Sequence, residues 1–206
     1  RDEDLRADRQ PEFTQIDCEM SFVEQDDILS TFEGLAKHLF KEIRGIDLPT
    51  PLRRMTWYEA MDRYGSDKPD LRFGMEIEEV TKTIQGHGFG VVDDAEYIGA
   101  IVVTGKADYT RKQIDQLTDF VKRPQVGAKG LLWLRYQADG TMKSSFDKFL
   151  TADQLKALAD QLSMQPGDIA LLISGGKRAA QKQLGTLRLH VASELGLMKP
   201  GHYECL

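Results

Sequence analysis

The spacing of apolar residues changes along the chain, and this change limits the folds open to it. Residues 13–22 alternate with a period of two, which predicts a half-buried strand with Ile16 and Cys18 on its inner face. From Asp26 the apolar residues follow spacings of three and four, which predicts an amphipathic helix that ends near Gly45. A chain that uses both periods belongs to the α+β or α/β class.

The rest of the chain repeats this change of period. Thr56 and Glu59 have the spacing of a capping box and predict a short helix that ends at Tyr64. A turn-rich boundary follows at residues 64–70. Beyond it the pattern predicts helices at residues 75–84, 110–122, 151–162 and 177–195, and strands at residues 98–103, 131–136 and 169–173. Residues 68–199 therefore have the size and the elements of a separate α+β domain.

Composition excludes several classes of protein. The 206 residues are 41% hydrophobic and 29% charged, which is typical of a globular chain. No segment approaches the roughly 20 apolar residues of a membrane helix, so no membrane association is expected. Two cysteines and four scattered histidines suggest neither a disulfide framework nor a metal site, and a reduced, cytoplasmic setting follows. The net charge of −6 disfavours a wholly cationic nucleic-acid-binding surface.

The outer face of the first predicted strand is unusually polar. Gln15, Asp17 and Glu19 share it, and Arg1 and Glu3 join them if they end a partner strand. Taken alone, such a face is most simply solvated, because antiparallel sheets often expose one side. The alternative is a binding surface, since a guanidinium suits phosphate oxygens and a carboxylate suits an ammonium group.

The first seventeen residues decide between these alternatives. RDEDLRADRQPEFTQID (residues 1–17) resembles motif 2 of the class II aminoacyl-tRNA synthetases, in the form found in the bacterial-type aspartyl-tRNA synthetases. RYGSDKPDLR (63–72), TRKQID (110–115) and GAKG (127–130) resemble the remainder of that family, including its inserted GAD domain. The resemblance implies an α+β fold: part of the antiparallel class II sheet with helices in residues 1–67, the inserted domain in 68–199, and a return to the catalytic core in 200–206.

The resemblance also implies a role for each matched residue. Arg1 corresponds to the catalytic arginine that contacts the α-phosphate of ATP and the carboxylate of aspartate. Glu3 and Gln10 correspond to ATP-binding residues. Asp17 corresponds to the residue that faces the α-ammonium of aspartate, with Gln15 beside it.

The loop between the two motif strands corresponds to the part that meets the acceptor end of tRNA, through Asp4, Arg6 and Arg9. The family implies ATP with Mg²⁺, aspartate and tRNA as ligands and a homodimer as the assembly, while this chain offers no metal site of its own. Both ends of the chain suggest a fragment of a larger enzyme, and the isolated fragment is expected to be inactive.

Two other functions are consistent with parts of the sequence. The inserted domain alone suggests a non-catalytic module that contacts RNA or protein, or an amidotransferase subunit, although motif 2 argues against the latter. Residues 174–177 (SGGK) lie between a strand and a helix, where backbone amides bind anions, but a plain turn is favoured. Basic residues of the last helix, Arg188 among them, either touch RNA phosphates or form a solvated face, and the second interpretation is favoured.

Overall fold

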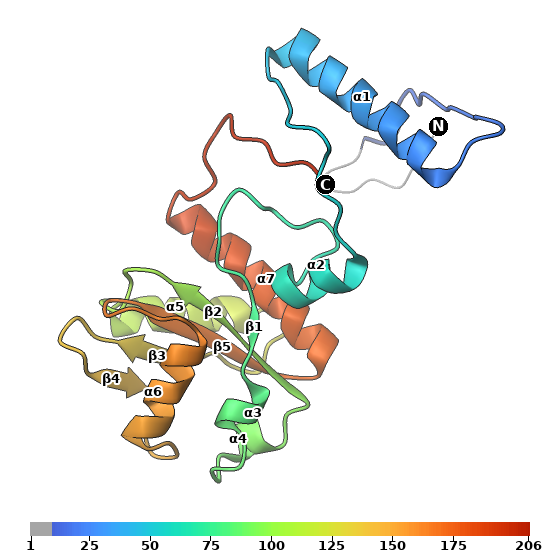
Figure 1. Cartoon of the computed structure of the whole chain (residues 1–206). Coiled ribbons are helices and arrows are strands. Elements are labelled where there is room, and N and C mark those ends of the chain that lie inside the picture. The colour runs from blue at the N-terminus through green and yellow to red at the C-terminus, as the bar shows by residue number, and fades with distance from the viewer. Residues whose placement is uncertain (1–9) are drawn as a thin grey trace. The chain divides into compact units, whose positions relative to one another are not determined.

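The computed structural model describes residues 10–206, which belong to two compact units, residues 1–53 and residues 54–206 (Figure 1). No helix of residues 10–206 is both long enough and apolar enough to cross a membrane.

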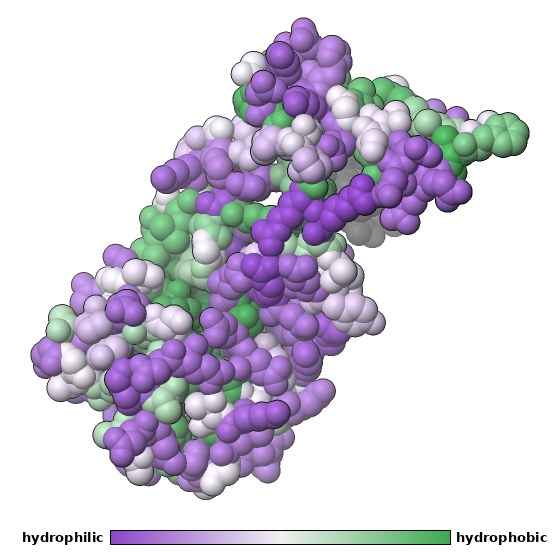
Figure 2. Space-filling view, in the orientation of Figure 1, coloured by the Kyte–Doolittle hydropathy of each residue, from purple (hydrophilic) through white to green (hydrophobic). Residues whose placement is uncertain are grey.

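The first unit contains one long helix, α1 (Gln25–Arg44), as the apolar spacing predicts. It ends at Gly45, whose left-handed conformation (φ 66°) lets its own N–H donate to the Lys41 carbonyl and the Ile46 N–H donate to the Phe40 carbonyl. No residue of α1 is buried. Hydrophobic residues are visible on the surface of this unit (Figure 2). Those of α1 that are exposed are Ile28, Leu29, Phe32, Leu35, Leu39 and Ile43.

The strand expected at residues 13–22 is absent, and this prediction is wrong for the described structure. The segment has no regular secondary structure, and Ile16, which was assigned to the buried face, is 84% exposed. Cys18 is exposed as well. A strand needs a neighbour that pairs with its backbone, and residues 10–206 pair no strand with this segment.

The second unit contains the sheet. Its helices are α2 (Trp57–Tyr64), α3 (Thr81–Ile84), α4 (Gly90–Asp93), α5 (Arg111–Lys122), α6 (Ala152–Gln161) and α7 (Lys177–Glu194). Its strands are β1 (Glu78–Glu79), β2 (Tyr97–Val103), β3 (Leu132–Tyr136), β4 (Met142–Ser144) and β5 (Ile169–Gly175). The strands form a five-stranded sheet in the order β1-β2-β5-β3-β4, in which every neighbouring pair is antiparallel. The architecture is therefore α+β.

Helices cover both faces of this sheet. Ile101, Leu171 and Ile173 point to one face, where they pack with the apolar residues of α5 and α7. Ala100 and Leu172 point to the other face, where they pack with α3, α4 and α6. Because β2 and β5 lie in the middle of the sheet, both of their faces are buried, which explains their continuous apolar sequences.

Most of the elements predicted for this unit are confirmed. Thr110 and Gln113 form the predicted capping box at the start of α5. At α2, the Thr56 side chain accepts a hydrogen bond from the Glu59 N–H (3.2 Å). The helix predicted over residues 75–84 is wrong in its first half. Met75 has a φ of 59°, which a right-handed helix excludes, and Glu78 and Glu79 pair with β2 as β1.

Helix α2 packs directly against α7 through two glycines. A Cβ on Gly65 would lie 2.0 Å from the Gln181 carbonyl oxygen, and one on Gly185 would lie 2.6 Å from the Tyr64 carbonyl oxygen. Gly65 also has a left-handed backbone (φ 69°) at the end of α2. The two helices approach this closely because neither position carries a side chain.

Arg188, expected on a solvated face of α7, is instead 1% exposed. Its guanidinium donates to four carbonyl oxygens in the loop after α2, those of Asp70, Phe73, Gly74 and Met75. The centre of the guanidinium lies 4.0 Å from the Phe73 ring centroid. Arg188 therefore holds this loop against α7 rather than presenting a charge to solvent.

Candidate functional site

The residues that the resemblance assigns to the synthetase site lie in the first unit. Arg1, Glu3, Asp4, Arg6 and Arg9 fall outside the described residues. The other three, Gln10, Gln15 and Asp17, are described and exposed, in a segment without regular structure. The structure therefore does not test the roles that the sequence assigns to this group.

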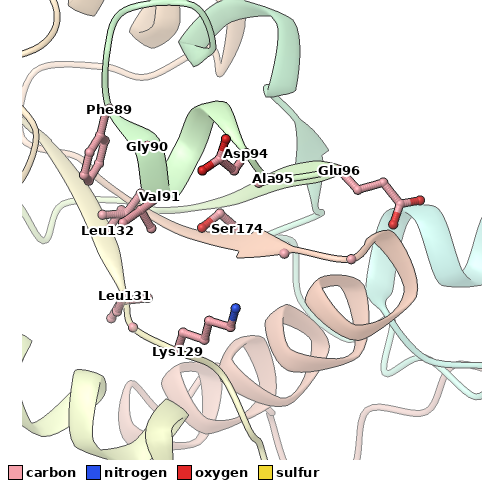
Figure 3. Close-up of a pocket in the computed structure, with 13 residues that line it drawn as sticks. Phe89, Gly90, Val91, Asp94, Ala95, Glu96, Lys129, Leu131, Leu132 and Ser174 are labelled. Carbon is pink, nitrogen blue, oxygen red and sulfur yellow. The ribbon is translucent and has the colours of Figure 1, made fainter.

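A cavity of about 730 Å³ lies in the second unit, beside the ends of three strands (Figure 3). Its wall comes from α4 and the residues on either side of it, the loop that leads into β3, and the end of β5 with the residue that follows it. The lining residues are Phe89, Gly90, Val91, Asp94, Ala95, Glu96, Lys129, Gly130, Leu131, Leu132, Ser174, Gly175 and Gly176.

The cavity exists because β3 separates from β5 before β5 ends. The register of this pair stops at Leu132 and Leu172, whereas β2 stays paired with β5 as far as Gly175. Along the described backbone, no hydrogen bond continues the β3–β5 ladder to Gly130 and Ser174. The last residues of β5 consequently border the cavity instead of another strand.

The register also fixes the direction of the Ser174 backbone. Its partner on β2 is Ile98, whose N–H donates to Thr81 Oγ1 (2.9 Å) and whose carbonyl accepts from the Val80 N–H (2.9 Å). Ile98 thus directs its polar groups toward β1. In an antiparallel pair this makes Ile98 and Ser174 a non-hydrogen-bonded pair, so the N–H and C=O of Ser174 point toward the side that β3 has left.

Charged and apolar groups share the lining. Val91, Leu131 and Leu132 supply apolar surface. Phe89, which also lines the cavity, stacks on Phe149 with ring centroids 4.5 Å apart. Figure 3 shows the Lys129 side chain extending from the loop before β3 toward the end of β5. The charged residues of the lining are this one lysine and two acids, Asp94 and Glu96.

The Glu96 side chain caps the N-terminus of α7. Its Oε2 accepts a hydrogen bond from the Lys177 N–H (3.2 Å), an N–H that no intrahelical carbonyl serves. A carboxylate at this position already provides the negative charge that the N-terminus of a helix favours. The structure thus agrees with the plain-turn interpretation of residues 174–177 rather than with an anion site.

Sequence reasoning did not find this cavity. Its polar groups come from three segments that are far apart in the chain, and only the SGGK segment drew notice. The fork between β3 and β5 follows from the register of pairing, which no local pattern specifies. Within residues 10–206, no three His, Cys, Asp or Glu side chains lie close enough together to hold a metal ion.

Comparison with known proteins identifies the family. The profile of the family described as tRNA synthetases class II (D, K and N) matches residues 1–185. The chain belongs to this family. The matched range includes residues 1–17, the segment that resembles motif 2.

Individual relatives of this class II synthetase chain carry the name aspartate–tRNA ligase. Those of Phocaeicola vulgatus and Bacteroides thetaiotaomicron are 59% and 58% identical to it over 207 aligned residues, and that of Flavobacterium psychrophilum is 50% identical over 206. Each alignment covers 100% of this chain and 35% of the relative. The chain thus spans about a third of the length of the curated relatives that it matches.

Proposed function

We propose that this chain is part of an aspartate–tRNA ligase, an enzyme that joins aspartate to tRNA at the expense of ATP. The supporting observation is the 59% identity over the whole chain to a protein of that name, within a family of class II synthetases for aspartate, lysine and asparagine tRNAs. The same match speaks against an amidotransferase subunit. The setting that fits this activity is the cytoplasm.

The proposed reaction has two steps. A carboxylate oxygen of aspartate attacks the α-phosphorus of ATP, a new P–O bond forms, and pyrophosphate leaves with the electrons of the broken P–O bond. The terminal ribose hydroxyl of tRNA then attacks the carbonyl carbon of aspartyl-adenylate, AMP leaves and the hydroxyl proton is lost. Both steps concentrate negative charge on the α-phosphate, where a positioned guanidinium is effective.

We assign that guanidinium to Arg1, which also holds the aspartate carboxylate. In the same assignment Glu3 and Gln10 bind ATP. Gln15 and Asp17 bind aspartate, and Asp17 contacts its α-ammonium group. The ammonium group would donate a charge-assisted hydrogen bond to the anionic carboxylate, and this bond orients the substrate.

The partners follow from the same proposal. Asp4, Arg6 and Arg9 contact the acceptor end of tRNA, and the enzyme is a homodimer. Mg²⁺ enters with ATP.

The domain organisation is part of the proposal. Residues 1–67 belong to the catalytic core, residues 68–199 form an inserted domain of the GAD type, and residues 200–206 return to the core. The compact second unit of the structure, residues 54–206, contains the whole inserted domain together with α2. The isolated 206-residue chain is expected to lack synthetase activity.

The test uses the full-length protein encoded by the gene. It should exchange labelled pyrophosphate into ATP when aspartate is present, and should then charge tRNA with aspartate. Asparagine and glutamate serve as matched controls, since one lacks the second carboxylate and the other is longer by one methylene. Exchange that is equal with all three amino acids, or absent with aspartate, would overturn the proposal.

A further inference from the structure

The last two strands of the sheet, β3 and β4, carry two cations side by side. Arg135 on β3 and Lys143 on β4 are register partners in the antiparallel pair, so their side chains point to the same face. Ile169, the partner of Arg135 on β5, packs on the face that α5 and α7 cover, and the two cations therefore lie on that face, toward the β4 edge. Lys143 is exposed and Arg135 is half-buried. Like charges directly opposite each other destabilise a sheet.

The Arg135 guanidinium rests on an aromatic ring. Its central carbon lies 4.7 Å from the centroid of the Trp133 ring. Its Nε is buried and has no hydrogen-bond partner among residues 10–206. The contact with the ring offsets part of this cost, but a buried donor without an acceptor remains unfavourable. The two terminal Nη groups form no hydrogen bond within the described residues and are not buried, so they are open to a ligand.

Within residues 10–206, neither Arg135 nor Lys143 forms an ion pair with a carboxylate. The acid that interacts with Lys143 at longer range is Asp139, in the turn between the two strands. Hydrogen bonds from Thr141 lower the pKa of Asp139, and the charge of Lys143 adds to this shift. The Asp139 Oδ1 accepts from the N–H and the Oγ1 of Thr141, at 2.9 and 2.7 Å. Two cations and one carboxylate already bonded within the turn leave this group of side chains positively charged.

We infer that Arg135 and Lys143 together bind a terminal phosphate group, one that has at least three free oxygens. A carboxylate has two oxygens in one plane, and the fork of the two Nη groups takes both of them. A terminal phosphate has a further oxygen outside that plane, which accepts from the Lys143 ammonium group. Its charge of about −2 matches the two cations and removes the repulsion between them.

The terminal phosphate belongs either to free inorganic phosphate or to a phosphate monoester such as a nucleotide. A phosphodiester inside an RNA chain fits less well, because it has only two free oxygens and one negative charge. The site therefore differs from a surface that follows a nucleic-acid backbone, where each phosphate contributes a single charge.

The test is a titration of the ¹⁵N-labelled 206-residue chain at pH 7.5 and constant ionic strength. The signals to follow are the backbone amides of Arg135 and Lys143 and the indole N–H of Trp133. Inorganic phosphate should shift all three signals to saturation. Acetate and dimethyl phosphate, each with two free oxygens and one charge, should bind at least about tenfold more weakly, the effect of one charge-assisted hydrogen bond.

Substitutions separate this pair from other surface cations. Lys143→Gln, at an exposed position, should weaken phosphate binding about tenfold. Arg135→Lys keeps the charge but loses the fork and should weaken binding as well. If the half-buried Arg135 variant fails to fold, Lys143→Gln decides. The matched control is Lys82→Gln, at an exposed position of α3 on the other face of the sheet, which should bind phosphate as the unsubstituted chain does.

Three results would overturn the inference: no shift with inorganic phosphate, equal affinity for acetate or dimethyl phosphate, or unchanged affinity in Lys143→Gln. Uridine monophosphate distinguishes the two sources of the phosphate group. Tighter binding of this monoester than of inorganic phosphate identifies a monoester as the ligand, and the reverse order identifies free phosphate. The inference does not depend on the proposed synthetase activity, which uses residues 1–17. Aspartate-dependent pyrophosphate exchange tests that activity separately, so either proposal can fail alone.

Discussion

At the scale of single residues, the buried Arg188 side chain ties the loop after α2 to α7. Arg188→Met should lower the free energy of unfolding by about 3 kcal/mol, because the carbonyls of Asp70, Phe73, Gly74 and Met75 lose a shared donor inside the protein. Arg188→Lys should recover only part of this loss, since an ammonium group lacks the planar fork. Urea denaturation measures both.

The matched control is Lys182→Met, on the same helix at an exposed position. It should change stability by less than about 0.5 kcal/mol. Equal effects of the two methionine substitutions would show that Arg188 acts only as surface charge.

The ion pair of Asp70 makes the stability of the same loop depend on pH. The Arg72 side chain donates to both carboxylate oxygens of Asp70, to Oδ1 at 2.9 Å and to Oδ2 at 2.6 Å, and this lowers the pKa of Asp70. A lowered pKa means that the stabilisation is present above the unfolded value of about 3.9 and is lost as the pH falls through the folded value.

Asp70→Asn should therefore destabilise the chain at pH 7 by about 1 kcal/mol, and this deficit should shrink as the pH falls below the unfolded value of about 3.9. Thermal unfolding at a series of pH values tests this. A deficit that grows as the pH falls below that value would contradict the assigned ion pair.

At the scale of elements, two glycines inside helices should respond oppositely to alanine. Gly185→Ala should destabilise the second unit by about 2 kcal/mol despite the better helix propensity of alanine, because its Cβ meets the Tyr64 carbonyl oxygen. Gly34→Ala in α1 meets no atom within 4 Å and should increase helicity, with a gain of up to about 1 kcal/mol. Circular dichroism of both variants distinguishes the effects, and a stabilised Gly185→Ala would disprove the close contact of α2 with α7.

Elements with strong local signals were predictable from the sequence. Helix α1 has a long apolar period and a terminal glycine, and α5 has a capping box, so their existence and limits follow from neighbouring residues. Strands β2 and β5 are apolar throughout because they are buried on both faces. The two errors, residues 13–22 and 75–84, lie where the outcome depends on pairing with a distant strand.

The candidate sites divide in the same way. The synthetase motif at residues 1–17 is contiguous, and a contiguous motif is visible in the sequence. In the cavity, Lys129, Asp94 and Ser174 lie together because β3 separates from β5 there. Its existence depends on where one ladder ends, and this is a property of the assembled sheet.

At the scale of the whole molecule, residues 54–206 should fold alone. Both apolar clusters found among residues 10–206 lie entirely within them, whereas α1 buries no residue. The isolated polypeptide of residues 54–206 should unfold in one cooperative transition.

A polypeptide of residues 68–199 is the matched comparison. It lacks α2, leaves Gly185 uncovered, and should be less stable. Scanning calorimetry of both measures the difference. Equal melting temperatures would show that α2 contributes nothing to the second unit and would favour a boundary at residue 67.

Arg1→Ala in the full-length protein tests most directly whether residues 1–17 belong to the synthetase site. Loss of one preorganised donor to a transition-state charge should reduce aspartate-dependent ATP–pyrophosphate exchange by roughly 10²–10³. Thermal stability should not change. Arg111→Ala, at a position whose side chain is 96% exposed, is the matched control and should retain full exchange. Undiminished exchange in Arg1→Ala would contradict the assignment.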